Sequence, residues 1–219
     1  MNVLLASAVE RYTLPSYALR FHAVAERLQK LGLLWGTMQQ QGPYIDENRN
    51  VIVESALNAK DPPSHIFFWD TDIELTAAQV QDLLQEKAVV SGLYFTRGEK
   101  PAPIAAWENN GEIVTIAPAV VQLYRNHPRA PTPLAVDLVG SGCLAVPLWV
   151  FQKLQPPWFK VVLGTIRVAQ SEDTFFCRKL KKAKIPLYVQ LDVYCPHITE
   201  VGTGLKEFLG DHGGSWLGV

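Results

Sequence analysis

Two carboxylates one residue apart follow an apolar run in the segment "HIFFWDTD", residues 65–72. Aspartate is unfavourable within strands, and the Asp70 and Asp72 carboxylates repel each other unless a positive charge lies between them. Ligands of open α/β sheets bind where the strands end, so the pair can hold a hard divalent cation that also contacts phosphate oxygens. The alternative is a solvated strand end with a turn-forming aspartate, and the rest of the chain has to decide between the two.

A second acidic pair lies in "SEDTFFCRKLKKA", residues 171–183. Glu172 and Asp173 come directly after Ser171, a residue suited to cap a helix. The acids complement the helix dipole, and basic residues follow toward the other end, which is one sufficient explanation for them. Carboxylates can also act as general bases, so the residue types alone leave both explanations open.

Three further groups could contribute to a site. In "ENRN", Arg49 can bind a carboxylate or a diphosphate with two hydrogen bonds, or it can be an exposed arginine near a helix start. His197, after Pro196, has an imidazole, a group that suits Mn²⁺ when it is neutral, or it could lie free on the surface. The glycines of "VGSGC", Gly140 and Gly142, let backbone approach a ligand closely, although the third glycine of a dinucleotide-binding loop is missing.

Alternating strands and helices have to position these residues. The pattern of apolar residues predicts this alternation up to residue 95, and thus a mostly parallel, doubly wound sheet in one domain. Residues 96–133, rich in proline and glycine, predict loops and small antiparallel strands. The expected strands are 3–7, 33–38, 65–70, 88–95 and 186–197, and the expected helices are 15–30, 46–59 (capped by Asp46), 77–86 (capping box of Thr76 and Gln79), 147–154 and 172–183.

The composition is that of an ordinary globular protein. Of 219 residues, 48% are hydrophobic and 19% charged, and the net charge of −1 gives no general attraction for nucleic acid or an anionic membrane. The three cysteines have no C-x-x-C spacing and favour core thiols in a reducing compartment. "VLLAS" is too short to span a bilayer and has no basic leader, so we expect a cytoplasmic protein without a transmembrane segment.

The order of these motifs resembles that of the GT-A glycosyltransferases, especially family-2-like and phage-type members. The resemblance covers residues 3–198 and is most specific in 171–197; it departs from the family pattern at Ser171 and Lys184, where glycine is commoner. It implies a single GT-A (Rossmann-like) α/β domain over residues 1–219. The implied sheet is mostly parallel and flanked by helices, with a small antiparallel subsheet, and residues 200–219 would form a flexible tail or a lid.

The resemblance also implies roles for individual residues. Asp70, Asp72 and His197 would hold Mn²⁺ or Mg²⁺ on the donor diphosphate. Asp173, beside Glu172, would be the acceptor-side base. The expected nucleotide-sugar-binding residues are Ser7, Ala8, Arg49, Asn50, Trp69, Asp70, Gly140 and Gly142.

The implied activity is metal-dependent transfer of a sugar from a nucleoside-diphosphate donor, such as a UDP-sugar, to an acceptor hydroxyl. The acceptor stays open: a glycan, a protein, a small molecule or a modified DNA base. Asp173 favours inversion, whereas a retaining enzyme would have the same metal site. Two other classes are a non-catalytic carbohydrate-binding protein and a sugar nucleotidyltransferase, whose Gly-rich basic loop is absent from "ASAVERYTLP". Trp149, Trp158 and Phe159 could wall the acceptor side or pack in the core.

Overall fold

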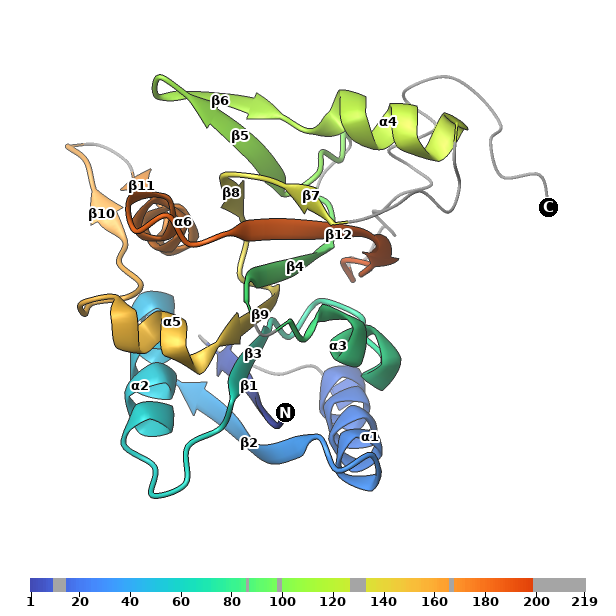
Figure 1. The fold of residues 1–219 in the computed structure, drawn as a ribbon, viewed down its shortest axis with the longest axis vertical. Coiled ribbons are helices and arrows are strands. Elements are labelled where there is room, and N and C mark those ends of the chain that lie inside the picture. Colours follow the sequence, from blue (N-terminus) through green and yellow to red (C-terminus); the bar gives the residue numbers. More distant parts are fainter. Residues whose placement is uncertain (10–14, 86, 98–99, 127–132, 166–167, 199–219) are drawn as a thin grey trace.

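A seven-stranded sheet runs through the centre of the computed structural model (Figure 1). The structure describes residues 1–9, 15–85, 87–97, 100–126, 133–165 and 168–198, so the tail predicted at 200–219 lies outside the described residues. The sheet order is β2-β1-β3-β9-β4-β12-β7. Its strands are β1 (Val3–Val9), β2 (Leu34–Gln41), β3 (His65–Trp69), β4 (Val89–Leu93), β7 (Leu134–Ala135), β9 (Cys143–Pro147) and β12 (Leu187–Tyr194).

Five of these strands point the same way, which confirms the prediction of a mostly parallel α/β sheet. β1 pairs in parallel with β2 and β3, and β4 pairs in parallel with β12. β9 is antiparallel to both β3 and β4 and separates them, and β7 is antiparallel to β12. The carboxyl ends of β3, β4 and β12 therefore meet the start of β9 at one edge, where Trp69 faces Cys143 and Leu93 faces Tyr194.

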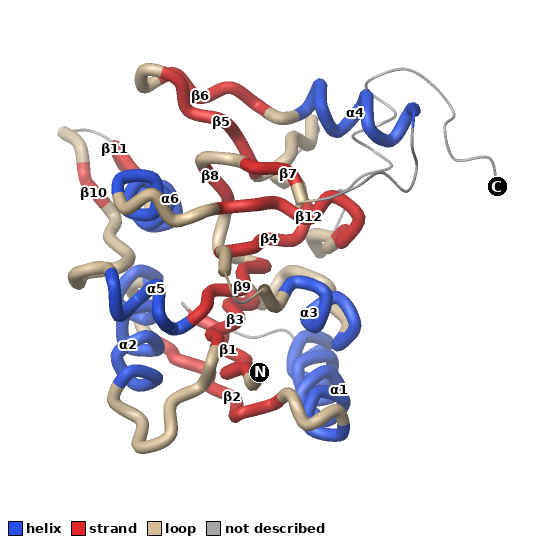
Figure 2. Tube along the Cα trace, viewed as in Figure 1, coloured by secondary structure: helices blue, strands red, loops and turns tan. Residues whose placement is uncertain are grey.

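Helices cover both faces of the sheet (Figure 2). One face carries α1 (Pro15–Lys30) and α3 (Ala77–Leu83), and the other carries α2 (Ile45–Leu57), α5 (Leu148–Lys153) and α6 (Glu172–Lys182). Each face has its own apolar core. None of the helices in the described ranges is long and apolar enough to cross a membrane.

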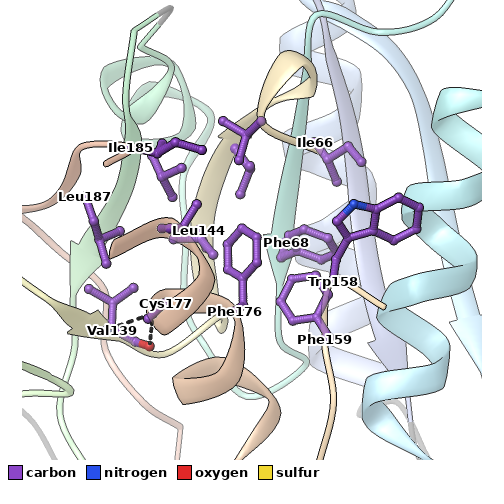
Figure 3. Close-up of a cluster of buried hydrophobic side chains, with 14 of the residues drawn as sticks. Ile66, Phe68, Val139, Leu144, Trp158, Phe159, Phe176, Cys177, Ile185 and Leu187 are labelled. Carbon is purple, nitrogen blue, oxygen red and sulfur yellow. Dashed lines mark hydrogen bonds between the residues drawn. The ribbon is translucent and has the colours of Figure 1, made fainter. Parts of the chain in front are cut away.

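Aromatic packing fixes α6 on the sheet (Figure 3). The Phe176 ring stacks on Phe159 with centroids 4.7 Å apart, and Phe159 meets Phe68 of β3 edge-on at 5.4 Å. Ser171 caps the helix by accepting the Thr174 N–H, as predicted. The first turn of α6 is thus held at a defined place above the sheet.

The middle of the chain confirms one prediction and corrects another. β5 (Ala105–Asn109) and β6 (Glu112–Thr115) pair antiparallel, as expected for residues 96–133. β8 (Leu138–Val139), beyond that range, adds a third strand, and β10 (Val162–Leu163) pairs with β11 (Val168–Gln170). The same region also contains a helix that the sequence pattern did not predict, α4 (Ala117–Asn126). Proline is tolerated in the first turn of a helix, where the amide it lacks has no intrahelical partner, so Pro118 does not prevent this one.

Helix starts were predicted with mixed success. The capping box of Thr76 and Gln79 is present at α3, although the helix ends at Leu83. The predicted cap of α2 was wrong: the helix begins at Ile45 after Tyr44, which makes no side-chain cap bond. Asp46 instead accepts the Val161 N–H at 2.9 Å and ties the helix to the segment after α5.

Candidate functional site

Asp70 follows β3 directly and lies against the turn before β9. Its N–H donates to the Gly142 carbonyl oxygen at 2.9 Å. A Cβ atom on Gly142 would lie 3.0 Å from Asp70 Oδ2, and one on Gly140 would lie 2.1 Å from the Tyr94 hydroxyl. The protein's own Asp70 and Tyr94 approach the two glycines closely, and the approach of a ligand there stays a prediction.

Arg49 of α2 connects three carboxylates from two distant parts of the chain. Its Nη2 lies 3.0 and 3.3 Å from the two carboxylate oxygens of Asp70. Its Nη1 donates to Glu172 and, at 3.3 Å, to Asp173 Oδ1. The strand-end aspartate and the acids at the start of α6 are thus brought together around one guanidinium.

This guanidinium is buried, with 2% of the side chain exposed. Its plane lies over the Phe159 ring, 5.9 Å from the centroid, and its Nε has no hydrogen-bond partner among the described residues. Burial alone would lower the pKa of Arg49, but the three carboxylates outweigh burial and raise the pKa above its ordinary value. One cation against three carboxylates leaves two negative charges in excess, and such a site attracts a further cation.

Asp173 has the electrostatics of a proton acceptor. Burial, then the nearby charges of Glu172 and Asp70, raise its pKa to about 6, opposed by Arg49 and by a hydrogen bond from Ser141. A quarter of its side chain remains exposed, so a substrate group can reach it. A carboxylate with a pKa near 6 is largely ionised at neutral pH and is a stronger base than an ordinary aspartate.

Tyr94 completes the floor of this site. Its hydroxyl accepts the Gly142 N–H at 3.0 Å. Burial and the charges of Asp173 and Asp70 raise its pKa well above the ordinary value, so the phenol stays protonated. The sequence singled out neither Tyr94 nor Ser141, since an apolar strand end and a serine between two glycines carry no chemical signal of their own.

Asp72 and His197 lie side by side although 125 positions separate them in the chain. Short pairing between the two segments places them: Ile73 bridges to His197, and the Ile198 N–H donates to the Asp72 carbonyl oxygen at 2.7 Å. His197 Nε2 is 3.5 Å from Asp72 Oδ2. The predicted proximity of these two side chains is therefore observed.

The imidazole is oriented in the way a metal ligand would need. His197 Nδ1 lies 2.6 Å from the Phe95 carbonyl oxygen, which can only accept, so Nδ1 carries the proton and Nε2 presents its lone pair to Asp72. Burial is the main cause that lowers the pKa of His197. The His197 lone pair and the Asp72 carboxylate are both electron-rich, so a cation between or beside them is favourable. Here the exposed guanidinium of Arg97 contacts Asp72.

The expected metal-binding set is only partly assembled. Asp70 turns to Arg49, whereas Asp72 and His197 face each other, and no group of three or more metal-binding side chains occurs among the described residues. A carboxylate and an imidazole are ligand types that suit a divalent cation such as Mn²⁺.

Several predicted nucleotide-sugar-binding residues are buried and already bonded within the protein. Ser7 is fully buried and donates its hydroxyl to the Trp69 carbonyl oxygen at 2.7 Å. Trp69 is equally buried and its indole N–H donates to the Ile73 carbonyl oxygen, while Ala8 is 7% exposed in β1. These three side chains are therefore enclosed in the protein interior.

Asn50 holds the segment after α5. Its amide nitrogen donates to the Phe159 carbonyl oxygen at 2.8 Å, and its oxygen accepts the N–H groups of Trp158 and Phe159. Trp158 and Phe159 are buried in the core, so packing is the correct interpretation for both of them. Asn50 thereby keeps the Phe159 ring beneath Arg49.

Comparison with known proteins adds information about the fold. No protein-family model and no curated protein matches the chain. The fold is similar to that of A197 from STIV. The match to that crystal structure has a TM-score of 0.57 over 91% of this chain and 87% of A197, with 16% sequence identity. At this identity the likeness to A197 concerns the α/β fold alone.

Proposed function

We propose that this protein transfers a sugar from a nucleoside-diphosphate donor to an acceptor hydroxyl, in a reaction that depends on a divalent cation. The main support is the guanidinium of Arg49, which joins Asp70 at the end of β3 to Asp173 at the start of α6. A donor-side and an acceptor-side carboxylate then lie within one hydrogen-bonded cluster, as transfer between two bound molecules requires.

The cation would be held by Asp72 and His197, with Asp70 close by. When bound, Mn²⁺ or Mg²⁺ would neutralise the charge of the leaving nucleoside diphosphate. Arg97 already contacts Asp72 and is 58% exposed, so its guanidinium is free to move to the diphosphate oxygens.

Asp173 acts as the base in this proposal. It takes the proton of the acceptor hydroxyl as the hydroxyl oxygen forms a bond to the anomeric carbon. The bond from that carbon to the diphosphate oxygen breaks, and the oxygen leaves with the electron pair. Attack on the side opposite the leaving group inverts the anomeric configuration. Arg49 keeps Asp173 and Asp70 in place, since its buried guanidinium has little freedom to move.

The test is calorimetric titration of the protein with UDP in the presence and absence of Mn²⁺. We expect UDP binding to require the cation and to weaken by more than about tenfold in Asp72→Ala, because a ligand of the cation is lost. Glu74→Ala is the matched control: this acid lies two residues further on and its side chain is half exposed. Equal UDP affinity with and without Mn²⁺ in wild type and Asp72→Ala would refute the metal-dependent mechanism.

A further inference from the structure

A hollow of about 410 Å³ opens beside Asp173, lined by residues at the start of α6 and by residues of the small β6-β5-β8 sheet. This volume is in the range of pockets that hold small molecules. Because Asp173 is one of its lining residues, a molecule bound in the hollow places a group directly at the carboxylate that the proposed function makes the base.

The walls of the hollow are apolar along their greater part. Ile104, Ala106, Ile113 and Leu138 line it from the three strands and the segment before them. Of the described residues that line it, Asp173 is the only charged one, and none has an aromatic ring. Polar side chains gather mainly at the α6 end, where Ser171 and Thr174 flank Asp173.

This distribution argues against a sugar as the occupant. A sugar ring carries hydroxyl groups all round, and each one costs free energy when it is buried without a hydrogen-bond partner. An apolar wall offers no such partners, whereas hydrocarbon gains free energy on leaving water. A molecule with one hydroxyl and an apolar body can donate a hydrogen bond to Asp173 and pack its hydrocarbon against the apolar walls.

We infer that the acceptor is an alcohol with an apolar body, which lies over β5, β6 and β8 and points its hydroxyl at Asp173. This inference rests on the proposed function for the role of Asp173, and it adds the chemical class of the acceptor. Ile113 is 58% exposed although it lines the hollow, and an acceptor of this kind would cover it.

Neighbouring residues of β6 supply a matched pair of variants. Successive side chains of a strand point to opposite faces of the sheet, so Ile113 faces the hollow and Val114, 39% exposed, faces away from it. Lysine at either position is tolerated by the fold, because both side chains already reach solvent. Thermal unfolding of Ile113→Lys and Val114→Lys checks that both variants fold.

Geraniol serves as the apolar alcohol and methyl glucoside as the sugar, each titrated by saturation-transfer NMR with UDP and the diamagnetic cation Mg²⁺ present. We expect geraniol to bind, and to bind about tenfold or more weakly in Ile113→Lys but unchanged in Val114→Lys, since a charge in an apolar wall opposes hydrocarbon. Binding of methyl glucoside in place of geraniol, or of neither, overturns the inference. The UDP signal in the same sample reports on the proposed function separately, so a failure of one is distinguishable from a failure of the other.

Discussion

Replacement of Arg49 by methionine removes the buried cation and keeps a long side chain against Phe159. Asp70, Glu172 and Asp173 then face one another without the guanidinium that joins them. Removing one partner of a buried ion pair costs about 3–5 kcal/mol of folding free energy. For a chain of this length, that loss lowers the melting temperature by about 6–20 °C.

The loss depends on pH, and its sign follows from the carboxylates. The pKa of Asp173 is already raised to about 6 by burial and by its acidic neighbours, and loss of Arg49, which opposes this shift, raises it further. An acid with a raised pKa in the folded state destabilises the fold increasingly as pH rises from its unfolded pKa to its folded one. We therefore expect Arg49→Met to lose more stability at pH 8 than at pH 5.

Urea unfolding followed by circular dichroism measures the free energy at both pH values. Lys30→Met is the control, because Lys30 and its partner Glu26 have side chains that are 64% and 61% exposed, and an exposed pair contributes less than about 1 kcal/mol. Adding Glu172→Gln to Arg49→Met should recover part of the lost stability. A loss in Arg49→Met that equals the control at pH 8, or that is the same at pH 5 and pH 8, would refute this account of the cluster.

Three further changes test other parts of the structure. Asp173→Asn should lower the rate of transfer by about 10²- to 10⁴-fold while UDP binding is retained, and near-normal turnover would leave Asp173 a helix-stabilising role only. In the wild type, kcat/KM should fall as the pH drops below about 6, because Asp173 is then protonated. Lys184→Gly should stabilise the fold by about 1 kcal/mol in urea unfolding, because Lys184 has a φ of 55° after α6, and a loss of stability would contradict this. Asn50→Ala should cost about 2–3 kcal/mol, since it leaves backbone groups of Trp158 and Phe159 without their partner; a loss under about 0.5 kcal/mol would show that the segment after α5 is held by other contacts.

The sequence predicts the alternating elements better than it predicts their inner faces. Pro15–Lys30 forms a helix with the expected bounds, because a long amphipathic stretch ends before a glycine. The apolar residues at helical spacing that indicated this helix included Leu19 and Leu28. Leu28 is buried, but the rest of the buried stripe contains Tyr17 and Phe21, and Leu19 is 75% exposed. Two stripes of apolar residues at helical spacing compete in this segment, and only the packing against Trp69 selects one.

Some residues of the candidate site could be predicted from the sequence, and others could not. Asp70 and Asp72 were identified because they follow a predicted strand, and ligands of α/β sheets bind at the carboxyl ends of strands. Both facts can be read from the sequence alone. The contact between Asp72 and His197 depends on the pairing of segments 72–74 and 196–198, so only the resemblance pointed to it. Arg97 was missed altogether, because an exposed arginine after a strand has no distinguishing pattern.

The antiparallel strand β9, between β3 and β4, determines when the sheet can be completed during synthesis. β3 and β4 follow each other along the chain, yet in the sheet each has β9, residues 143–147, as a neighbour, and that strand is synthesised much later. Until that segment has left the ribosome, each of the two strands keeps an open hydrogen-bonding edge of the kind that pairs with other chains. Stalled nascent chains that end before Cys143 should therefore stay sensitive to protease and bind chaperones. Chains that extend past β12, the other neighbour of β4, should resist, and protection of the shorter chains would contradict this order.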